Sequence, residues 1–173
     1  PHLLALIADD LTGAADTAVQ FASEGFRSFV LLDPVDSTSP LPTEADVLAY
    51  NTNSRNVPPH EAQRIMEALF TSHHQIAGMS IYKKIDSTLR GNIAVELDVI
   101  MQLSTCSYAI VCPALPSQGR TLVHGVMLER GVPVTLGFAG RDPQSQVVES
   151  NVPVMLAHEC SQPVIACGIE DLS

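Results

Sequence analysis

The sequence predicts an α/β protein of three layers, in which helices cover both faces of a mostly parallel sheet. Continuous apolar runs, which are typical of strands buried on both faces, alternate with segments that have the spacing of amphipathic helices. Repeated strand–helix units of this kind form parallel sheets. The chain has 173 residues, of which 46% are hydrophobic and 16% charged, and this composition argues against disorder.

Four strands are predicted in the first half of the chain. They are residues 3–8, 28–32, 47–50 and 79–83. After the first of them, Ala15, Ala18, Val19 and Ala22 recur at helical spacing and indicate a buried helix face. Gly25 follows this pattern at a position that favours the end of the helix.

A second helix is predicted to begin at the pair Pro58 and Pro59, because proline at the first helical position loses no hydrogen bond. Glu61 complements the helix dipole there. The apolar spacing continues to residue 69, and a third helix is predicted over residues 92–103.

The second half of the chain contains a predicted β-hairpin near residues 121–136. Two apolar runs, 122–128 and 132–136, flank the turn Arg130-Gly131. The remaining predicted elements are a fifth strand of the main sheet over residues 107–112, a helix over 152–159 and a last strand over 164–167. No helix is predicted to cover that last strand, so we expect part of the protein to lie beyond residue 173.

Acidic residues outnumber basic ones, since 19 Asp and Glu stand against 9 Lys and Arg, for a net charge of −10. Non-specific binding to nucleic acid or to an anionic membrane needs clustered positive charge, so we expect neither partner. No apolar run approaches the length of about 20 residues that spans a membrane. The first residues lack the basic region of a secretory signal, so none is expected.

None of the four cysteines forms a CxxC pair. They are Cys106, Cys112, Cys160 and Cys167. A disulfide scaffold is usually shorter and richer in cysteine, and a zinc site has tighter ligand spacing. We therefore expect buried, reduced thiols, and hence a cytoplasmic protein.

Polar side chains gather where the predicted strands end, which is where an open parallel sheet binds its ligands. The candidate substrate-binding residues are Asp9, Asp10, Thr12, Asn53, Ser54, Arg55, Lys84, Asp86, Ser87, Arg90 and Gln118. Five of the nine basic residues lie in these segments, namely Arg55, Lys83, Lys84, Arg90 and Arg120. The scarce positive charge is therefore concentrated at one predicted edge of the sheet.

This combination of side chains is suited to a small, hydroxylated anion. Arginine holds a carboxylate with a planar fork of donors, and lysine supplies a point charge. The carboxylates of Asp9, Asp10 and Asp86 can accept hydrogen bonds from hydroxyls, and one of them could act as a general base. These three residues and Lys84 are the candidate catalytic residues. Backbone N–H groups at the helix starts also favour an anion.

Simpler roles are open for several of these residues. Asp9 and Asp10 could be turn and cap residues, and Thr12 could be a helix cap. Asp86 and Arg90 could form only a local ion pair, which contributes little when it is exposed.

Adjacent residues of a strand face opposite ways, so only one of Lys83 and Lys84 should face the site. The position of Lys84 nearer the loop favours that residue. His73 and His74 are most simply explained as a polar helix end, and no third ligand is placed to form a metal site. We therefore expect no metal to be bound.

Several long segments resemble the four-carbon acid sugar kinase family. They are residues 7–18 (IADDLTGAADTA), 51–55 (NTNSR) and 83–92 (KKIDSTLRGN), with 113–123, 131–133 and 141–143. The resemblance covers nearly the whole chain. Asn51 departs from the family because an Asp is expected there, which could change the sugar acid that fits. Ala94 stands where Gly is common and should affect helix packing only.

The resemblance implies that residues 1–173 are the N-terminal, sugar-acid-binding domain of an ATP-dependent kinase. Its substrate would be a four-carbon acid of the threonate, erythronate or 3-oxo-tetronate type. ATP and Mg²⁺ would bind through a C-terminal domain outside these residues. That division agrees with the sequence, which has neither the G-x-x-x-x-G-K-[ST] nor the G-x-G-x-x-G nucleotide motif.

Two other functions remain open. The first is a stand-alone module that binds a sugar acid without catalysis. The second is a haloacid-dehalogenase-like phosphatase, which also begins with an apolar strand and aspartates. Such a phosphatase needs Asp-x-Asp, so that both side chains face the same way, whereas Asp9 and Asp10 are adjacent.

Overall fold

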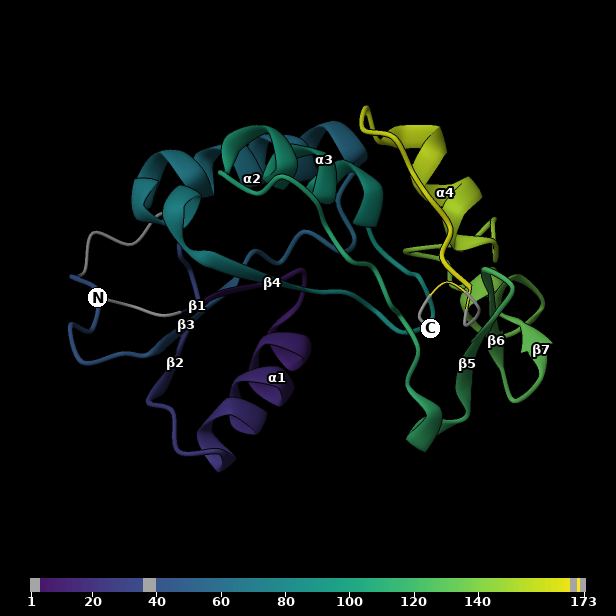
Figure 1. Ribbon diagram of the computed structural model, residues 1–173, viewed down its shortest axis with the longest axis horizontal. Helices are drawn as coiled ribbons and strands as arrows, with labels where there is room; N and C mark the ends of the chain where they lie inside the picture. The colour runs from purple at the N-terminus through teal and green to yellow at the C-terminus, as the bar shows by residue number, and fades with distance from the viewer. Residues whose placement is uncertain (1–3, 36–39, 169–170, 172–173) are drawn as a thin grey trace.

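A parallel sheet of four strands forms the centre of the larger part of the molecule (Figure 1). The computed structural model describes residues 4–35, 40–168 and 171. The strands are β1 (Leu4–Ala8), β2 (Ser28–Leu31), β3 (Val47–Asn51) and β4 (Ser80–Lys84). Their order is β2-β3-β1-β4, and all pairings are parallel. The inner strands β1 and β3 are buried almost throughout, which explains their continuous apolar sequences.

Helices cover both faces of this sheet (Figure 1). They are α1 (Leu11–Ser23) on one face, and α2 (Pro59–Ser72) and α3 (Ile93–Leu103) on the other. Successive residues of a strand face opposite ways. Leu6 therefore shares a core cluster with Ala14 and Ala18 of α1, whereas Ile7 shares one with Met66 of α2. The predicted three-layer α/β fold is confirmed.

The buried face of α1 differs from the predicted one. Asp10 caps the helix by accepting a hydrogen bond of 2.8 Å from the backbone N–H of Gly13. Ala14 and Ala18 are buried against the sheet, while Val19, which we expected inside, is 55% exposed. Small side chains at positions 14 and 18 allow close approach to the sheet, and this contact sets the rotation of the helix.

A second, antiparallel sheet and a short helix lie at the other end of the molecule (Figure 1). Its strands are β5 (Arg120–Val123), β6 (Val126–Glu129) and β7 (Val132–Pro133), and the helix is α4 (Val152–Glu159). The predicted hairpin at Arg130-Gly131 is confirmed by the pairing of β6 with β7. The run expected as one strand is interrupted at His124-Gly125, where φ values of 48° and 80° make a tight turn.

Short 3-10 helices complete the connections. They are His74–Gly78, Pro116–Gln118, Val134–Leu136 and Ala139–Arg141. Of the helices in the described ranges, none is both long and apolar enough to cross a membrane.

Two predicted strands, 107–112 and 164–167, are not formed. Residues in both segments pair with no strand of the described chain. Ile110 is 88% exposed and Ile165 is 83% exposed. An apolar run becomes a strand only where it lies close enough to a neighbouring backbone to pair with it. Neither segment is hydrogen-bonded to β4, the last strand of the sheet in the described chain.

The cysteines are free, but the expectation that they are buried is wrong. Cys112 and Cys167 are exposed, and Cys106 and Cys160 are partly exposed. Both exposed thiols lie in the two segments that fail to form strands. Their exposure therefore has the same cause as the missing strands.

A buried ion pair joins β4 to α3. Lys83 Nζ lies 2.5 Å from Glu96 Oε2, and their side chains are only 9% and 1% exposed. The other carboxylate oxygen of Glu96 accepts a short hydrogen bond from Ser54 Oγ. The Ser54 hydroxyl lies 2.7 Å from that of Thr52, which donates to the carbonyl of Ala8. These contacts connect four elements beneath the carboxyl ends of the strands.

Replacing Glu96 by Gln removes the charge that balances Lys83 and leaves the ammonium buried alone. We expect urea denaturation to show a loss of about 3–5 kcal/mol in the free energy of unfolding. The double variant Lys83→Met/Glu96→Leu removes both charges and should recover most of that loss. If the double variant lost as much unfolding free energy as the two single substitutions together, Lys83 and Glu96 would not be a coupled pair.

Candidate functional site

The candidate site lies at the carboxyl ends of β1, β3 and β4. The chain leaves β1 toward α1 on one face, whereas it leaves β3 and β4 toward α2 and α3 on the other. When neighbouring strands connect to helices on opposite faces of the sheet, a crevice remains between the connections. Open α/β sheets bind their ligands in this crevice. Polar side chains from all three strand ends meet there.

Arg55 binds both aspartates that follow β1. Its Nε and Nη2 atoms donate to the two carboxylate oxygens of Asp9 at 2.9 and 2.8 Å, and its Nη1 atom donates to Asp10 at 2.6 Å. Burial alone would lower the pKa of Arg55, but the hydrogen bond and charge of Asp9 raise it. Asp9 is buried, whereas the Asp10 side chain is 26% exposed. Asp10 is therefore the more accessible of the two carboxylates.

A second arginine, Arg90, is held by two carboxylates in the same way. Its Nε and Nη2 atoms donate to Asp86 at 3.0 and 3.1 Å, and its Nη1 atom donates to Asp142 at 3.2 Å. Burial would raise the pKa of Asp86, but hydrogen bonds from Arg90 and Thr88 outweigh it and hold that pKa well below its usual range. The local ion pair considered from the sequence is present, and Asp142 extends it to a distant loop.

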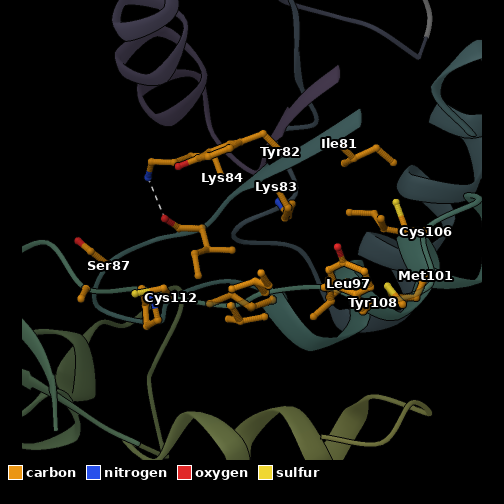
Figure 2. Close-up of a pocket in the computed structure, with 18 of the residues that line it drawn as sticks. Ile81, Tyr82, Lys83, Lys84, Ser87, Leu97, Met101, Cys106, Tyr108 and Cys112 are labelled. Carbon is orange, nitrogen blue, oxygen red and sulfur yellow. Dashed lines mark hydrogen bonds between the residues drawn. The ribbon is translucent and has the colours of Figure 1, made fainter. Parts of the chain in front are cut away.

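Lys84 has no carboxylate partner in the part of the chain that the structure describes. Its Nζ donates to the carbonyl oxygen of Ile85 at 2.8 Å (Figure 2). The side chain lies against the start of α1, because a Cβ atom on Gly13 would be 3.7 Å from Lys84 Nζ. The first N–H groups of a helix have no intrahelical partner and favour an anion. Lys84 and the start of α1 therefore form a positive region with free donors.

A third arginine borders the site. Arg120 donates to the hydroxyl of Ser87 at 3.2 Å, to Gln118, and to Glu129 at 3.2 Å. The predicted residues Ser87 and Gln118 are thus drawn together by a residue of β5. The small sheet is in this way joined to the loop that follows β4.

The remaining predicted residues are less directly placed for contact with a ligand. Thr12 is exposed in the first turn of α1. Asn53 is exposed at φ 50° and lines a separate cavity of about 450 Å³ with Asn51. Ser54 is fully buried, and its hydroxyl binds Glu96.

The two departures noted in the sequence are both buried. The Asn51 side-chain amide donates to the carbonyl of Leu32 at 3.2 Å and so links β3 to β2. A carboxylate at this position could not donate that bond. Ala94 is 2% exposed within α3, as expected of a residue that affects packing.

Gly91 allows the two arginine-centred clusters to approach each other. Its φ is +93°, and a Cβ atom there would lie 2.6 Å from Asp9 Oδ2. Its N–H donates to Ser145 at 2.7 Å. Only glycine fits here without displacing Asp9, so the backbone at Gly91 lies close against the Asp9 carboxylate.

Sequence reasoning missed Asp142, Ser145, Glu96 and Glu129 as residues of this region. Asp142 lies 52 positions beyond Arg90 in the chain, and no periodic pattern relates them. The only sequence signal is that Arg141-Asp142-Pro143 belongs to the segments that carry the family resemblance. Among residues 4–35, 40–168 and 171, no group of His, Cys, Asp and Glu is arranged to hold a metal ion.

The arrangement can bind a small anion that carries hydroxyls. Each of the two central arginines uses only part of its fork on the aspartates, so N–H donors remain. Lys84 adds a charge that pairs with no carboxylate among the described residues. The exposed side of Asp10 can accept a hydrogen bond from a hydroxyl.

The chain is similar in sequence to several longer proteins that are named as kinases. The chain is 36% identical over 168 residues to D-threonate kinase of Salmonella typhimurium, a match that covers 96% of this chain and 39% of that protein. It is 35% identical to D-erythronate kinase of Heliobacterium modesticaldum over 165 residues, covering 92% of this chain and 36% of that protein. The chain therefore spans well under half the length of these relatives.

Solved structures share the fold. A domain of unknown function from Bordetella bronchiseptica, crystallised with bound citrate as a domain-swapped dimer, has a TM-score of 0.83 and 35% identity to the chain. The match covers 91% of this chain and 40% of that one. The family model described as a sugar-binding N-terminal domain matches residues 4–173. With nearly its whole length matched, the chain belongs to the family of sugar-binding N-terminal domains.

Proposed function

We propose that this chain binds a four-carbon sugar acid and forms the substrate-binding part of a longer, ATP-dependent kinase. The relatives that support the substrate class are named D-threonate, D-erythronate and 3-oxo-tetronate kinases. The observation that carries the proposal is Lys84, a cation without a carboxylate partner in the described chain, beside aspartates that Arg55 holds in place.

The positive groups have a common task in this proposal. Lys84, the start of α1 and the unused N–H groups of Arg55 and Arg90 bind the carboxylate of the acid or the phosphoryl group that is transferred. Phosphoryl transfer depends mainly on positioning and on stabilising the charge of the transition state. Citrate, found in the Bordetella structure, is also a small, hydroxylated anion and fits this chemistry.

The aspartates bind hydroxyls and orient the substrate. Asp10 is best placed to accept the proton of the attacking hydroxyl, because its side chain is the more exposed of the two that follow β1. Asp86 is a poor general base, since its low pKa makes it a weak proton acceptor. We assign Asp86 to holding Arg90, and buried Ser54 to supporting the adjacent Arg55.

ATP and Mg²⁺ would be supplied by a nucleotide-binding domain elsewhere in the longer polypeptide. Residues 1–173 would then act as one substrate-binding domain, whose site is completed when the two domains close. The four free thiols fit a reducing compartment, and on that ground we propose a cytoplasmic location. The phosphatase alternative is not favoured, because Asp9 is buried and Arg55 binds both of its carboxylate oxygens.

Isothermal titration of the chain with D-threonate, D-erythronate and related acids tests the substrate class, with ATP as the control. We expect one acid to bind and ATP not to bind. Tight binding of ATP would contradict the division between the two domains. Release of phosphate from a phosphorylated acid without ATP would instead favour a phosphatase.

Single substitutions Lys84→Ala and Arg90→Ala test the positive groups in the longer kinase. We expect each to lower kcat/KM at least about 100-fold, because charge stabilisation in the transition state is lost. Arg27→Ala is the matched control, since Arg27 forms an exposed ion pair with Asp46 away from the site. Near-normal turnover in both test variants would contradict the proposed roles of Lys84 and Arg90.

The comparison of Gly91→Ala with Gly25→Ala isolates the contact above Asp9. Both glycines have similar φ values, +93° and +91°, but a Cβ atom at Gly25 meets nothing within 4 Å. Both variants should therefore lose similar backbone stability, whereas only Gly91→Ala should weaken binding of the sugar acid by about tenfold or more. Equal affinities by titration would show that Asp9 is not held by this contact.

A further inference from the structure

The outer edge of β4 has no partner strand in the described part of the chain. β4 pairs with β1 along its whole length, from Leu4 with Ser80 to Ala8 with Lys84. It is the last strand in the sheet order, so the backbone groups on its other side are unpaired. Parallel sheets are normally buried, and an open edge is a template for another strand.

A cavity of about 540 Å³ separates this edge from the segment 107–114 (Figure 2). Leu97 and Met101 of α3 line this cavity, together with Tyr108 and Cys112 of that segment. The backbone of 107–114 forms no hydrogen bond with any residue of 4–35 or 40–168. Two unpaired backbones therefore face the same cavity.

Both walls of this cavity run in the same direction. The N–H of Thr105 donates to the carbonyl of Ala77 at 2.9 Å, which fixes the start of the segment near the start of β4. Beyond the other end, Ser87 accepts a hydrogen bond of 3.2 Å from Arg120. All strands of the main sheet are parallel. A strand that paired in the same way with β4 and with residues 107–114 would run parallel to both, and its carboxyl end would lie beside Lys84.

We propose that a parallel β-strand from the longer polypeptide, outside residues 1–173, fills this cavity. The inference rests on the proposed function only because it requires that longer polypeptide. The chain spans 39% of the Salmonella relative and 36% of the Heliobacterium relative, so proteins of that length have ample chain to supply such a strand. The unpaired backbones of β4 and of residues 107–114 favour a strand as the occupant. A small molecule could not form hydrogen bonds along both of them.

The residues that line the cavity determine which side chains the inserted strand can carry. Its alternate side chains would face opposite sides of the sheet. Those directed toward α3 would meet Leu97 and Met101, so they must be apolar. Those directed toward α1 would meet Tyr82 and Lys84 (Figure 2), so aromatic or acidic side chains fit. The residues after the strand would enter the candidate site beside Lys84 and would complete the site as well as the sheet.

Amide hydrogen exchange tests the proposal without any ligand, in the 173-residue chain and in the longer polypeptide. In the short chain, peptides covering 107–114 should exchange close to their intrinsic rates. In the longer polypeptide they and the peptide covering β4 should exchange at least about tenfold more slowly. The peptide covering β3 is the control, because it is paired on both sides in either protein.

Three outcomes would overturn the proposal. Equal exchange of 107–114 in both polypeptides would mean that no strand fills the cavity. Slow exchange in the short chain at every concentration would mean that residues 107–112 pair with β4 themselves. Protection that rises with concentration, with a dimer in sedimentation, would identify a second copy as the occupant.

A pair of charged substitutions tests the same surface by stability. Ile110 and Val148 are 88% and 81% exposed, and only Ile110 lines the cavity. Ile110→Lys and Val148→Lys should leave the Tm of the short chain unchanged, whereas only Ile110→Lys should lower the Tm of the longer polypeptide. Equal effects of the two variants there would contradict the proposal.

The results separate this inference from the proposed function, because neither measurement involves a sugar acid or ATP. A longer polypeptide that phosphorylates a sugar acid but leaves 107–114 unprotected overturns only the inserted strand. Protection of that segment in a polypeptide without kinase activity overturns only the proposed function.

Discussion

The alternation of side chains along β4 sends the only two lysines of the chain to opposite faces of the sheet. Lys83 is buried and pairs with Glu96 of α3, which also holds Ser54. Lys84 lies at the start of α1 without a carboxylate partner in the described residues. One lysine therefore stabilises the loops that carry the candidate site, and the other adds positive charge at that candidate site.

The arginines of the site depend on that support. Arg55 directly follows Ser54, whose hydroxyl is bound by Glu96 and whose carbonyl accepts a hydrogen bond of 2.9 Å from the Asn92 side chain. Asn92 follows the loop that carries Arg90 and Gly91. A shift in the buried pair would thus reach both arginine-centred clusters, which meet near Gly91.

The mixture of charges explains how a protein with a net charge of −10 can be suited to a small anion. Aspartates hold the arginines rigidly, so their remaining donors are ordered before a ligand arrives. The same aspartates repel an extended polyanion, which would have to contact the acidic surface beyond the site. In the proposed function, this placement of few cations among many carboxylates would favour a small anion over an extended one.

Much of this architecture could be predicted from short-range patterns. The apolar runs of β1 and β3, the start of α2 at Pro59 and the hairpin at Arg130-Gly131 all agree with the sequence, because each depends on neighbouring residues. The rotation of α1 was predicted wrongly, since it depends on contacts with the sheet. Residues 107–112 have the composition of a strand, but a cavity separates them from the free edge of β4, and they pair with no strand of the described chain.

The sequence by itself determined that polar groups would gather at one edge of a parallel sheet, because strand direction alone brings the strand ends together. Only the tertiary structure decided which of those groups face outward. It buried Ser54 against Glu96 and brought Asp142 to Arg90 across 52 positions of chain. These choices arise from packing between segments that are distant in sequence, and no local pattern records them.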